Sequence, residues 1–473
     1  MGDAAVSAAA PRLLRWLALA ALLLSGGLSL SLIYWPGIIT SDSEQQYAEA
    51  LTGNFDDWHP PMMNWVWRGL GHIASGPAPM LVLQLLLYGA GIAGLALWAW
   101  RRGRPGLAAA LCATTMLPLP AALMGEVLKD SLMAGALTAA ASLALLATAD
   151  DGEGRRGLRI AAALLTVFAA TLRFNAFPAG VPILLLVGGA HGKSSWWRLA
   201  LGAVLSTAIL VGAMPVANRA LGAGRSDVEL SLVIFDLAGI TRRTGQDMFP
   251  PLPAAHPAKI ISRCYFPVEW DSYSWWAEPL CPISFAAIDE SFHAHKIAPY
   301  GYLVRQIVAH PLAYAGHRLT HWNIATRFLV RGPVDRPVQR QSVANPWGFA
   351  VTQGPALDAL DRLDVALGVW PPGWPCCYIG LAAGLLLASA SLPSRLAIRM
   401  LAGSGLLYAL AYAVFSVASE LRYYLWTMIA TALAAAITIS DLAALPLHAR
   451  RRAGLAALLP FAIVTITAMA WRI

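Results

Sequence analysis

An acidic pair, Asp42 and Glu44, follows directly after the first long apolar run of the chain. A carboxylate at the edge of a membrane can accept a proton from a sugar or protein hydroxyl, or help to hold a divalent cation. The alternative is structural, because Thr40 to Glu44 resembles a helix start in which Ser41 or Asp42 would be the N-cap. We predict Asp42 and Glu44 as catalytic residues and as candidate ligands of Mg²⁺ or Mn²⁺.

A second charged group, Asp56, Asp57 and His59, comes a few residues later and is followed by Pro60-Pro61. The prolines restrict the backbone, so these ionisable side chains are predicted to be held rigidly and to bind substrate. The alternative is a solvated turn before an interfacial amphipathic helix over residues 62–73.

Three short turns between apolar runs add further charged or polar side chains. The predicted substrate-binding residues in these turns are Lys129, Asp130, Arg173, Asn175, Glu420, Arg422 and Tyr423. Each residue alone is consistent with an ordinary side chain that reaches the membrane surface from a helix end. Together, the cations of the three turns could converge on one anionic group, and a guanidinium suits phosphate oxygens.

The elements that carry these turns are apolar runs long enough to cross a membrane. Hydrophobic residues make up 58% of the 473-residue chain and charged residues 13%, and many runs approach the roughly 20 residues that a span needs. The fold class predicted is an all-α polytopic membrane protein with about eleven spans. They are placed at 13–33, 79–100, 107–123, 132–148, 158–172, 177–189, 199–218, 378–392, 400–418, 425–443 and 453–470.

The basic residues predict the orientation of these spans. Arginine and lysine cluster in alternate short connections, such as 101–104, 155–159, 193–198, 395–399 and 450–452. The positive-inside rule places these connections in the cytoplasm, so the acidic loop over 34–78 and the three charged turns lie outside. This distribution also argues against nucleic acid as the partner, although the net charge is +8.

Three parts are predicted along the chain. Residues 1–218 form an N-terminal transmembrane module, residues 219–375 a mostly helical periplasmic subdomain, and residues 376–473 the C-terminal transmembrane helices. In the middle part, Cys264 and Cys281 could form a disulfide in an oxidising compartment. His317 and His321 share a helical face, which we interpret as an amphipathic helix on the membrane in preference to a zinc site.

These features fit one chemistry. A polyprenyl-phosphate sugar keeps its tail in the membrane and its phosphate at the surface. Transfer of the sugar needs a carboxylate to take a proton from the acceptor and cations to stabilise the departing phosphate. The chain shows neither a P-loop nor a dinucleotide-binding fingerprint, so a soluble nucleotide donor is not indicated.

The motifs in their order resemble the GT-C superfamily of membrane glycosyltransferases, which includes protein mannosyltransferases, aminoarabinose transferases and uncharacterised bacterial relatives. The resemblance rests on Ser41-Asp42-Ser43-Glu44, the 56–61 motif, Leu128-Lys129-Asp130, Arg173-Phe174-Asn175 and Glu420-Leu421-Arg422-Tyr423.

The resemblance implies a GT-C-like bundle and an inverting transfer from an undecaprenyl-phosphate sugar. It makes Asp42 the general base or a metal-linked carboxylate with Glu44 beside it, and it lets Asp57 and His59 line the site. Lys129, Arg173 and Arg422 would contact the donor phosphate. The expected acceptor is a periplasmic glycan, lipid A or protein, and the expected location is the bacterial inner membrane, with the active site on the periplasmic side.

Two other functions are compatible with this type of sequence. An O-antigen polymerase or ligase also uses external basic residues but takes a lipid-pyrophosphate donor, and the acidic first loop favours the transferase. A lipid or solute transporter would place ionisable groups near the middle of the bilayer on broken helices in repeated halves, which the sequence does not show.

Overall fold

The structure is a computed structural model and describes residues 3–149, 154–189, 195–252, 254–331 and 336–473. The described residues form helices and connecting loops. Two isolated β-bridges, Ile38 with Glu126 and Asp56 with Gly224, also occur among them. Clustering of the chain gives two compact units. The first unit contains residues 1–224, 333–409 and 421–467, and the second contains residues 225–332, 410–420 and 468–473.

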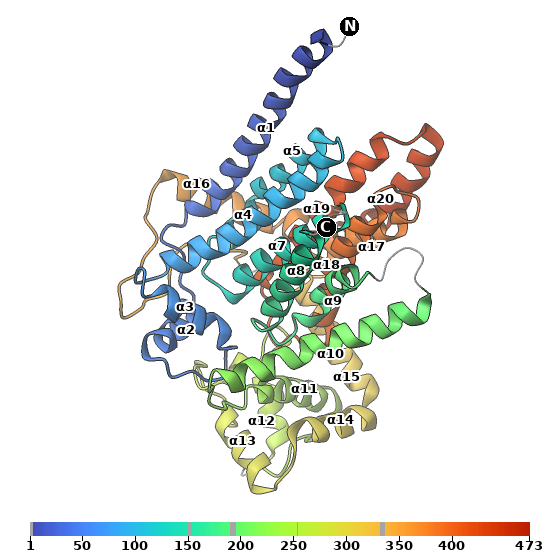
Figure 1. Cartoon of the computed structure of the whole chain (residues 1–473). Coiled ribbons are helices and arrows are strands. Elements are labelled where there is room, and N and C mark those ends of the chain that lie inside the picture. The colour runs from blue at the N-terminus through green and yellow to red at the C-terminus, as the bar shows by residue number, and fades with distance from the viewer. Residues whose placement is uncertain (1–2, 150–153, 190–194, 253, 332–335) are drawn as a thin grey trace. The chain divides into compact units, whose positions relative to one another are not determined.

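The first unit holds most of the long apolar helices (Figure 1). Its helices up to the second unit are α1 (Asp3–Leu32), α2 (Ser41–Thr52), α3 (Met62–Leu70), α4 (Ala78–Arg101), α5 (Pro105–Ala113), α6 (Pro118–Leu123), α7 (Lys129–Ala149), α8 (Gly154–Ala170), α9 (Phe177–Val187) and α10 (Trp196–Ala220). The later helices are α16 (Pro355–Gly368), α17 (Pro375–Ser389), α18 (Arg395–Phe415), α19 (Leu425–Ala443) and α20 (Leu447–Arg472). The ends of α18 and α20 belong to the second unit.

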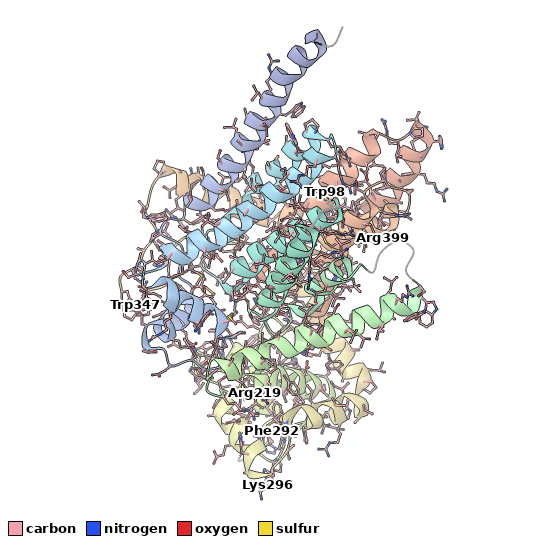
Figure 2. All side chains as sticks on the ribbon, viewed as in Figure 1. Trp98, Arg219, Phe292, Lys296, Trp347 and Arg399 are labelled. Carbon is pink, nitrogen blue, oxygen red and sulfur yellow. A yellow bond between two sulfur atoms is a disulfide. The ribbon has the colours of Figure 1, made fainter. Side chains whose placement is uncertain are left out.

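Seven helices are long and apolar enough to cross a membrane, so the prediction of an all-α polytopic membrane protein is confirmed. They are α1, α4, α7, α10, α18, α19 with its leading turn, and α20, with α5, α9 and α17 as shorter apolar helices. In the core of the unit, α7 packs between α4 and α8. Trp98 of α4, labelled in Figure 2, is buried there.

Two of the eleven predicted spans are wrong as single crossings. The run 107–123 is interrupted by a 3₁₀ turn over Thr114–Met116, and Leu117 is extended with ψ 118°. The cause is Pro118, which lacks a backbone N–H and excludes the helical conformation from the residue before it. The run 177–189 forms only the 11-residue helix α9, which at 1.5 Å per residue is about half the thickness of the hydrocarbon layer.

Three of the predicted cytoplasmic connections lie at one end of the first unit. Arg104, between α4 and α5, pairs with Asp441 at the end of α19 at 2.7 Å. Ser394, just before α18, accepts from Arg104 at 3.0 Å and donates through its backbone N–H to Asp441 at 2.8 Å. These contacts agree with a common side for these connections. Of the basic residues used in the orientation argument, Lys193 lies outside the described residues.

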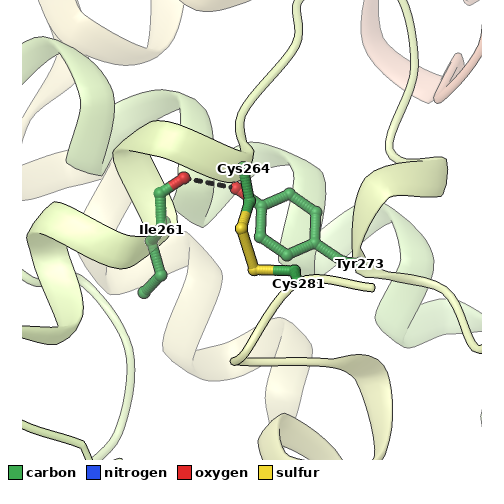
Figure 3. Close-up of a disulfide and its surroundings, with 4 residues drawn as sticks. All are labelled: Ile261, Cys264, Tyr273 and Cys281. Carbon is green, nitrogen blue, oxygen red and sulfur yellow. Dashed lines mark hydrogen bonds between the residues drawn. A yellow bond between two sulfur atoms is a disulfide. The ribbon is translucent and has the colours of Figure 1, made fainter. Parts of the chain in front are cut away.

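The second unit is built from five helices: α11 (Glu229–Thr244), α12 (Pro257–Cys264), α13 (Phe285–Ala294), α14 (Pro299–Ala309) and α15 (Pro311–Ala325). The structure joins Cys264 to Cys281, as predicted (Figure 3). Beside this disulfide, the Tyr273 hydroxyl donates to the Ile261 carbonyl at 2.7 Å.

A buried polar network, here called the Asp236 network, joins α11 to α15. His317 Nε2 lies 3.1 Å and Arg318 Nε lies 2.6 Å from Asp236 Oδ1. The Tyr265 hydroxyl lies 2.8 Å from His317 Nδ1, and His321 Nδ1 lies 2.8 Å from the Pro267 carbonyl. His317 and His321 do share a face, but that face is buried inside the unit. The interpretation of the whole helix as an amphipathic helix on the membrane stays a prediction.

The predicted three-part division stays a prediction, because compact units do not identify a side of the membrane. The structure does show that residues 336–375 pack with the first unit. One contact of this kind joins the Tyr34 hydroxyl to Asp364 Oδ2 at 3.1 Å, deep in that unit.

Candidate active site

Helix α2 presents Asp42 at its first turn. Thr40 is the N-cap: its side chain accepts from the Ser43 backbone N–H at 3.3 Å, and its own backbone N–H donates to the Ser43 hydroxyl at 2.9 Å. The expectation that Ser41 or Asp42 is the N-cap is therefore wrong. Because Thr40 and Ser43 satisfy the helix end, the carboxylate of Asp42 is available for other contacts, and the helix N-terminus favours its negative charge.

Two cations from distant parts of the sequence contact one oxygen of Asp42. Lys129 Nζ, at the first residue of α7, lies 3.0 Å from Asp42 Oδ2. Arg422, in the 3₁₀ turn that precedes α19, places its guanidinium 3.1 Å from the same oxygen. The site therefore brings together the acidic loop over 34–78 and two of the three charged turns.

His59 supports Lys129 from the other side. Lys129 Nζ lies 2.8 Å from His59 Nδ1, and an ammonium can only donate, so Nδ1 is the acceptor and the ring is neutral. Burial, followed by the charge of Lys129, lowers the pKa of His59 to about 3. A neutral histidine fixes the ammonium without adding charge to the site.

The third turn contributes Arg173. Its guanidinium pairs with Asp130, the neighbour of Lys129, and lies 4.5 Å from the centre of the Tyr423 ring. The guanidinium carbon of Arg422 lies 5.5 Å from the same ring. Tyr423 thus faces both arginines, each at a distance typical of a cation–π contact. We call the seven residues the Asp42 cluster: Asp42, His59, Lys129, Asp130, Arg173, Arg422 and Tyr423.

The cluster carries an excess of positive charge. Three cations and two carboxylates leave one positive charge, since His59 is neutral. Asp130 is buried and the Lys129 and Arg422 side chains are 10% and 12% exposed, whereas the Asp42 side chain keeps 24% of its surface exposed. Burial alone would raise the pKa of Asp42, but Arg422 and Lys129 hold it well below its usual range.

The position of the cluster along the spans follows from α19. Arg422 lies just before this 19-residue helix, and Asp441 near its other end belongs to the Arg104 contacts. A helix of that length extends about 28 Å. The Asp42 cluster and the basic connections are therefore at opposite ends of the spans.

Other predicted site residues lie outside the cluster. Glu44, Asp56 and Asn175 make no hydrogen bond or ion pair with it in the part of the chain that the structure describes. Asp56 instead accepts from the Trp58 backbone N–H at 2.8 Å, and the Asp57 backbone N–H donates to Gly224 at 2.9 Å. Glu420 belongs to the second compact unit. A role for these residues stays a prediction.

The charge balance opposes a metal ion at Asp42. A divalent cation at Asp42 would lie beside Lys129 and Arg422, which both contact this carboxylate, and would join an already positive site. Among the described residues, the group of three side chains arranged to hold a metal is Asp227, Asp289 and His293 in the second unit. Arg225 already pairs with Asp227 in that group at 2.7 Å. The assignment of Asp42 and Glu44 as metal ligands stays a prediction that this geometry does not favour.

The sequence found every member of the Asp42 cluster but not the contacts inside it. Asp130 and Tyr423 were predicted to bind substrate, whereas in the structure they contact Arg173. The Thr40–Ser43 cap was missed, because the usual capping-box pattern has Glu or Gln at the position that Ser43 occupies.

Comparison with known proteins gives a distant structural similarity. No protein-family model matches the sequence, and no curated protein matches it significantly. Two solved structures of an Archaeoglobus fulgidus oligosaccharyltransferase are similar at 13% identity, with TM-scores of 0.37 and 0.38. One is tethered to an acceptor peptide with an NVT sequon, and the other, AglB, is in complex with an inhibitory peptide and a dolichol-phosphate.

The similarity covers 96% of this chain, which spans only about half of those proteins, 55% and 56% of their length. At this level of similarity, neither the activity nor the ligands of those proteins transfer to this chain.

Proposed function

We propose that the chain is a membrane glycosyltransferase of GT-C type that moves a sugar from a polyprenyl-phosphate donor to an acceptor. The observation that carries this proposal is the Asp42 cluster: an accessible carboxylate beside three largely buried cations, with one excess positive charge, at the end of membrane-spanning helices. This combination provides an anion site and a proton acceptor within one group of side chains.

The excess charge fits the donor phosphate. A sugar linked to a lipid through one phosphate is a phosphodiester with a single negative charge. Lys129, Arg173 and Arg422 offer donors to its oxygens, and a guanidinium pairs with phosphate through two parallel hydrogen bonds. Because Lys129 begins α7 and Arg422 precedes α19, a phosphate bound there leaves its lipid tail beside the spans.

The reaction balances with Asp42 as the proton acceptor. The acceptor oxygen attacks the anomeric carbon, the bond between that carbon and the phosphate oxygen breaks, and the acceptor proton passes to Asp42. A single displacement of this kind inverts the anomeric centre. The lipid phosphate leaves with one more negative charge than the diester had, and the arginines and lysine stabilise that charge as it develops.

The location of the site supports the choice of acceptor. The basic connections lie at the opposite end of the spans from the cluster, so the positive-inside rule places the cluster on the external face. For a bacterial inner membrane this is the periplasmic side. Acceptors available there include a glycan, lipid A or a protein.

The charge balance favours this function over a polymerase or ligase with a lipid-pyrophosphate donor. A pyrophosphate diester carries two negative charges and would leave the cluster with a net negative charge. A transporter is less favoured still. Its substrate path through the bilayer would need charged groups near the middle of the membrane, whereas in this chain they gather at the end of the spans.

Sugar transfer by the purified protein tests the proposal. The wild-type chain, in lipid vesicles with a radiolabelled polyprenyl-phosphate sugar and a periplasmic extract as acceptor, should produce labelled acceptor. Asp42→Asn should reduce this transfer at least about a thousandfold, since it removes the proton acceptor. Asp358→Asn, which changes an exposed carboxylate on α16, is the matched control and should retain activity.

A protein that transferred no sugar from any polyprenyl-phosphate donor, yet carried such a molecule across the vesicle membrane, would exclude the glycosyltransferase and establish the transporter.

A further inference from the structure

The cations that a donor phosphate needs are already occupied by Asp42. Lys129 and Arg422 both contact Asp42 Oδ2, at 3.0 and 3.1 Å. This carboxylate oxygen accepts a hydrogen bond from Lys129 and forms an ion pair with Arg422, so it has the charge environment that suits a phosphate oxygen. Asp42 therefore occupies a position that a phosphate oxygen of the donor would take.

The two cations are held in place by other neighbours. Lys129 contacts His59 at 2.8 Å, and Arg422 faces the ring of Tyr423. Both side chains are nearly buried. Because they cannot move far without losing these contacts, an incoming phosphate has to take over the hydrogen bond of Lys129 and the ion pair of Arg422 from Asp42.

Asp42 is also the most accessible partner of the exchange. It is the more exposed group of each pair, and the cap of α2 does not use its carboxylate. Asp130 differs from Asp42 in exposure and in partner. Its side chain is 1% exposed and pairs with Arg173. The exchange therefore concerns Asp42, and Asp130 keeps Arg173 in position.

We infer that Asp42 is a built-in competitor of the donor phosphate, which holds Lys129 and Arg422 until the donor arrives and is then released to act as the base. This inference rests on the proposed function. While both cations contact Asp42, its pKa is well below the usual range, so it is a poor proton acceptor. Once the phosphate takes the cations, the carboxylate regains basicity beside the bound sugar.

The exchange implies an order of events. Without donor, Asp42 is neutralised and does not activate an acceptor hydroxyl or water. With donor, the same binding step places the phosphate and creates the base. The donor therefore binds before the acceptor becomes reactive, and the empty site is inactive.

Binding of a polyprenyl phosphate that lacks the sugar tests the inference directly. Decaprenyl phosphate is titrated into the full-length protein in detergent micelles by isothermal calorimetry. If Asp42 competes with phosphate, Asp42→Asn and Asp42→Ala should each bind decaprenyl phosphate about tenfold more tightly than the wild type, although neither transfers sugar. A base or metal ligand without the competing role predicts unchanged or weaker binding.

Asp358→Asn is the matched control for charge. It removes one carboxylate from an exposed position on α16, where Asp358 pairs with Arg340 and not with the cations of the Asp42 cluster. Its affinity for decaprenyl phosphate should change less than twofold, so a larger effect at Asp42 reports direct competition. Retained thermal unfolding temperatures show that the variants are folded.

The outcomes separate the two proposals. One outcome is that the wild type binds decaprenyl phosphate, Arg422→Gln weakens this binding, and neither Asp42 variant binds more tightly than the wild type. That outcome overturns the competition and leaves the proposed function standing. If the wild type binds no decaprenyl phosphate at all, the proposed function falls as well.

Discussion

Each of the two units contains an aspartate that pairs with an arginine in a cluster that also includes a neutral histidine, and the environments of these aspartates differ. In the first unit, Asp42 is partly exposed and its cluster has one excess positive charge. In the second unit, the side chain of Asp236 is 2% exposed and pairs with the single cation Arg318. His317 there is neutral, because burial lowers its pKa, so the Asp236 network has no excess charge.

The difference shows which charged cluster is suited to chemistry. In the Asp236 network, the charges cancel and the groups are closed to solvent, which is the pattern of a group that fixes the packing of helices. In the Asp42 cluster, an uncompensated charge and an accessible carboxylate remain. Residue types alone do not distinguish the two groups; access and charge balance do.

The largest expected effect comes from reversing a charge in the Asp42 cluster. Arg422→Glu should weaken binding of decaprenyl phosphate at least about a hundredfold, because it removes a donor and adds a repulsive charge. Binding of the acceptor should change far less. Titration of each ligand separately measures the two effects, and equal losses would count against a phosphate-binding role for Arg422.

The corresponding change in the second unit should affect stability. Asp236→Asn leaves Arg318 as a buried charge without its carboxylate, which typically costs about 3–5 kcal/mol. Thermal unfolding in detergent should show this loss, whereas Asp42→Asn should unfold close to the wild-type temperature. If Asp236→Asn lowered transfer without lowering stability, the contrast between the two units would be wrong.

A glycine next to the Asp236 network gives a smaller expected effect. A Cβ added to Gly239 would lie 2.2 Å from the His317 ring, whereas one added to Gly301 of α14 meets no atom within 4 Å. Gly239→Ala should therefore destabilise the protein by about 1–3 kcal/mol. Gly301→Ala, in an open helical position, should be neutral or stabilising. Urea unfolding of the two variants checks the difference.

Acid should weaken the second unit with the smallest of these effects. Burial lowers the pKa of His321 to about 3, while the unfolded chain binds the proton near pH 6.5. The stability contributed by the neutral ring is therefore complete above pH 6.5 and is lost progressively as the pH falls toward 3. At pH 5 the loss is about 2 kcal/mol.

Hydrogen exchange of α15 between pH 7 and pH 5, corrected for the intrinsic rate, measures this effect. His293→Gln, at an exposed histidine of α13, should leave the pH dependence unchanged. A pH dependence that persisted in full in His321→Gln would assign the effect to other groups.

The sequence by itself determined the membrane class and most of the long helices, and it selected the residues that form the Asp42 cluster. Apolar runs of sufficient length specify spanning helices, and charged residues at their ends have few alternatives to the membrane surface. For this reason Asp42, Lys129, Arg173 and Arg422 could be selected without coordinates.

Only the tertiary structure decided which of these residues meet and which face of a helix is covered. The pairing of Asp42 with Lys129 and Arg422 joins residues 87 and 380 positions apart, and hydrophobic periodicity contains no information about such contacts. For α15, the spacing of His317 and His321 established a common face, but its burial depends on Asp236 and Phe235 of α11. Local patterns specify a face; long-range packing selects its partner.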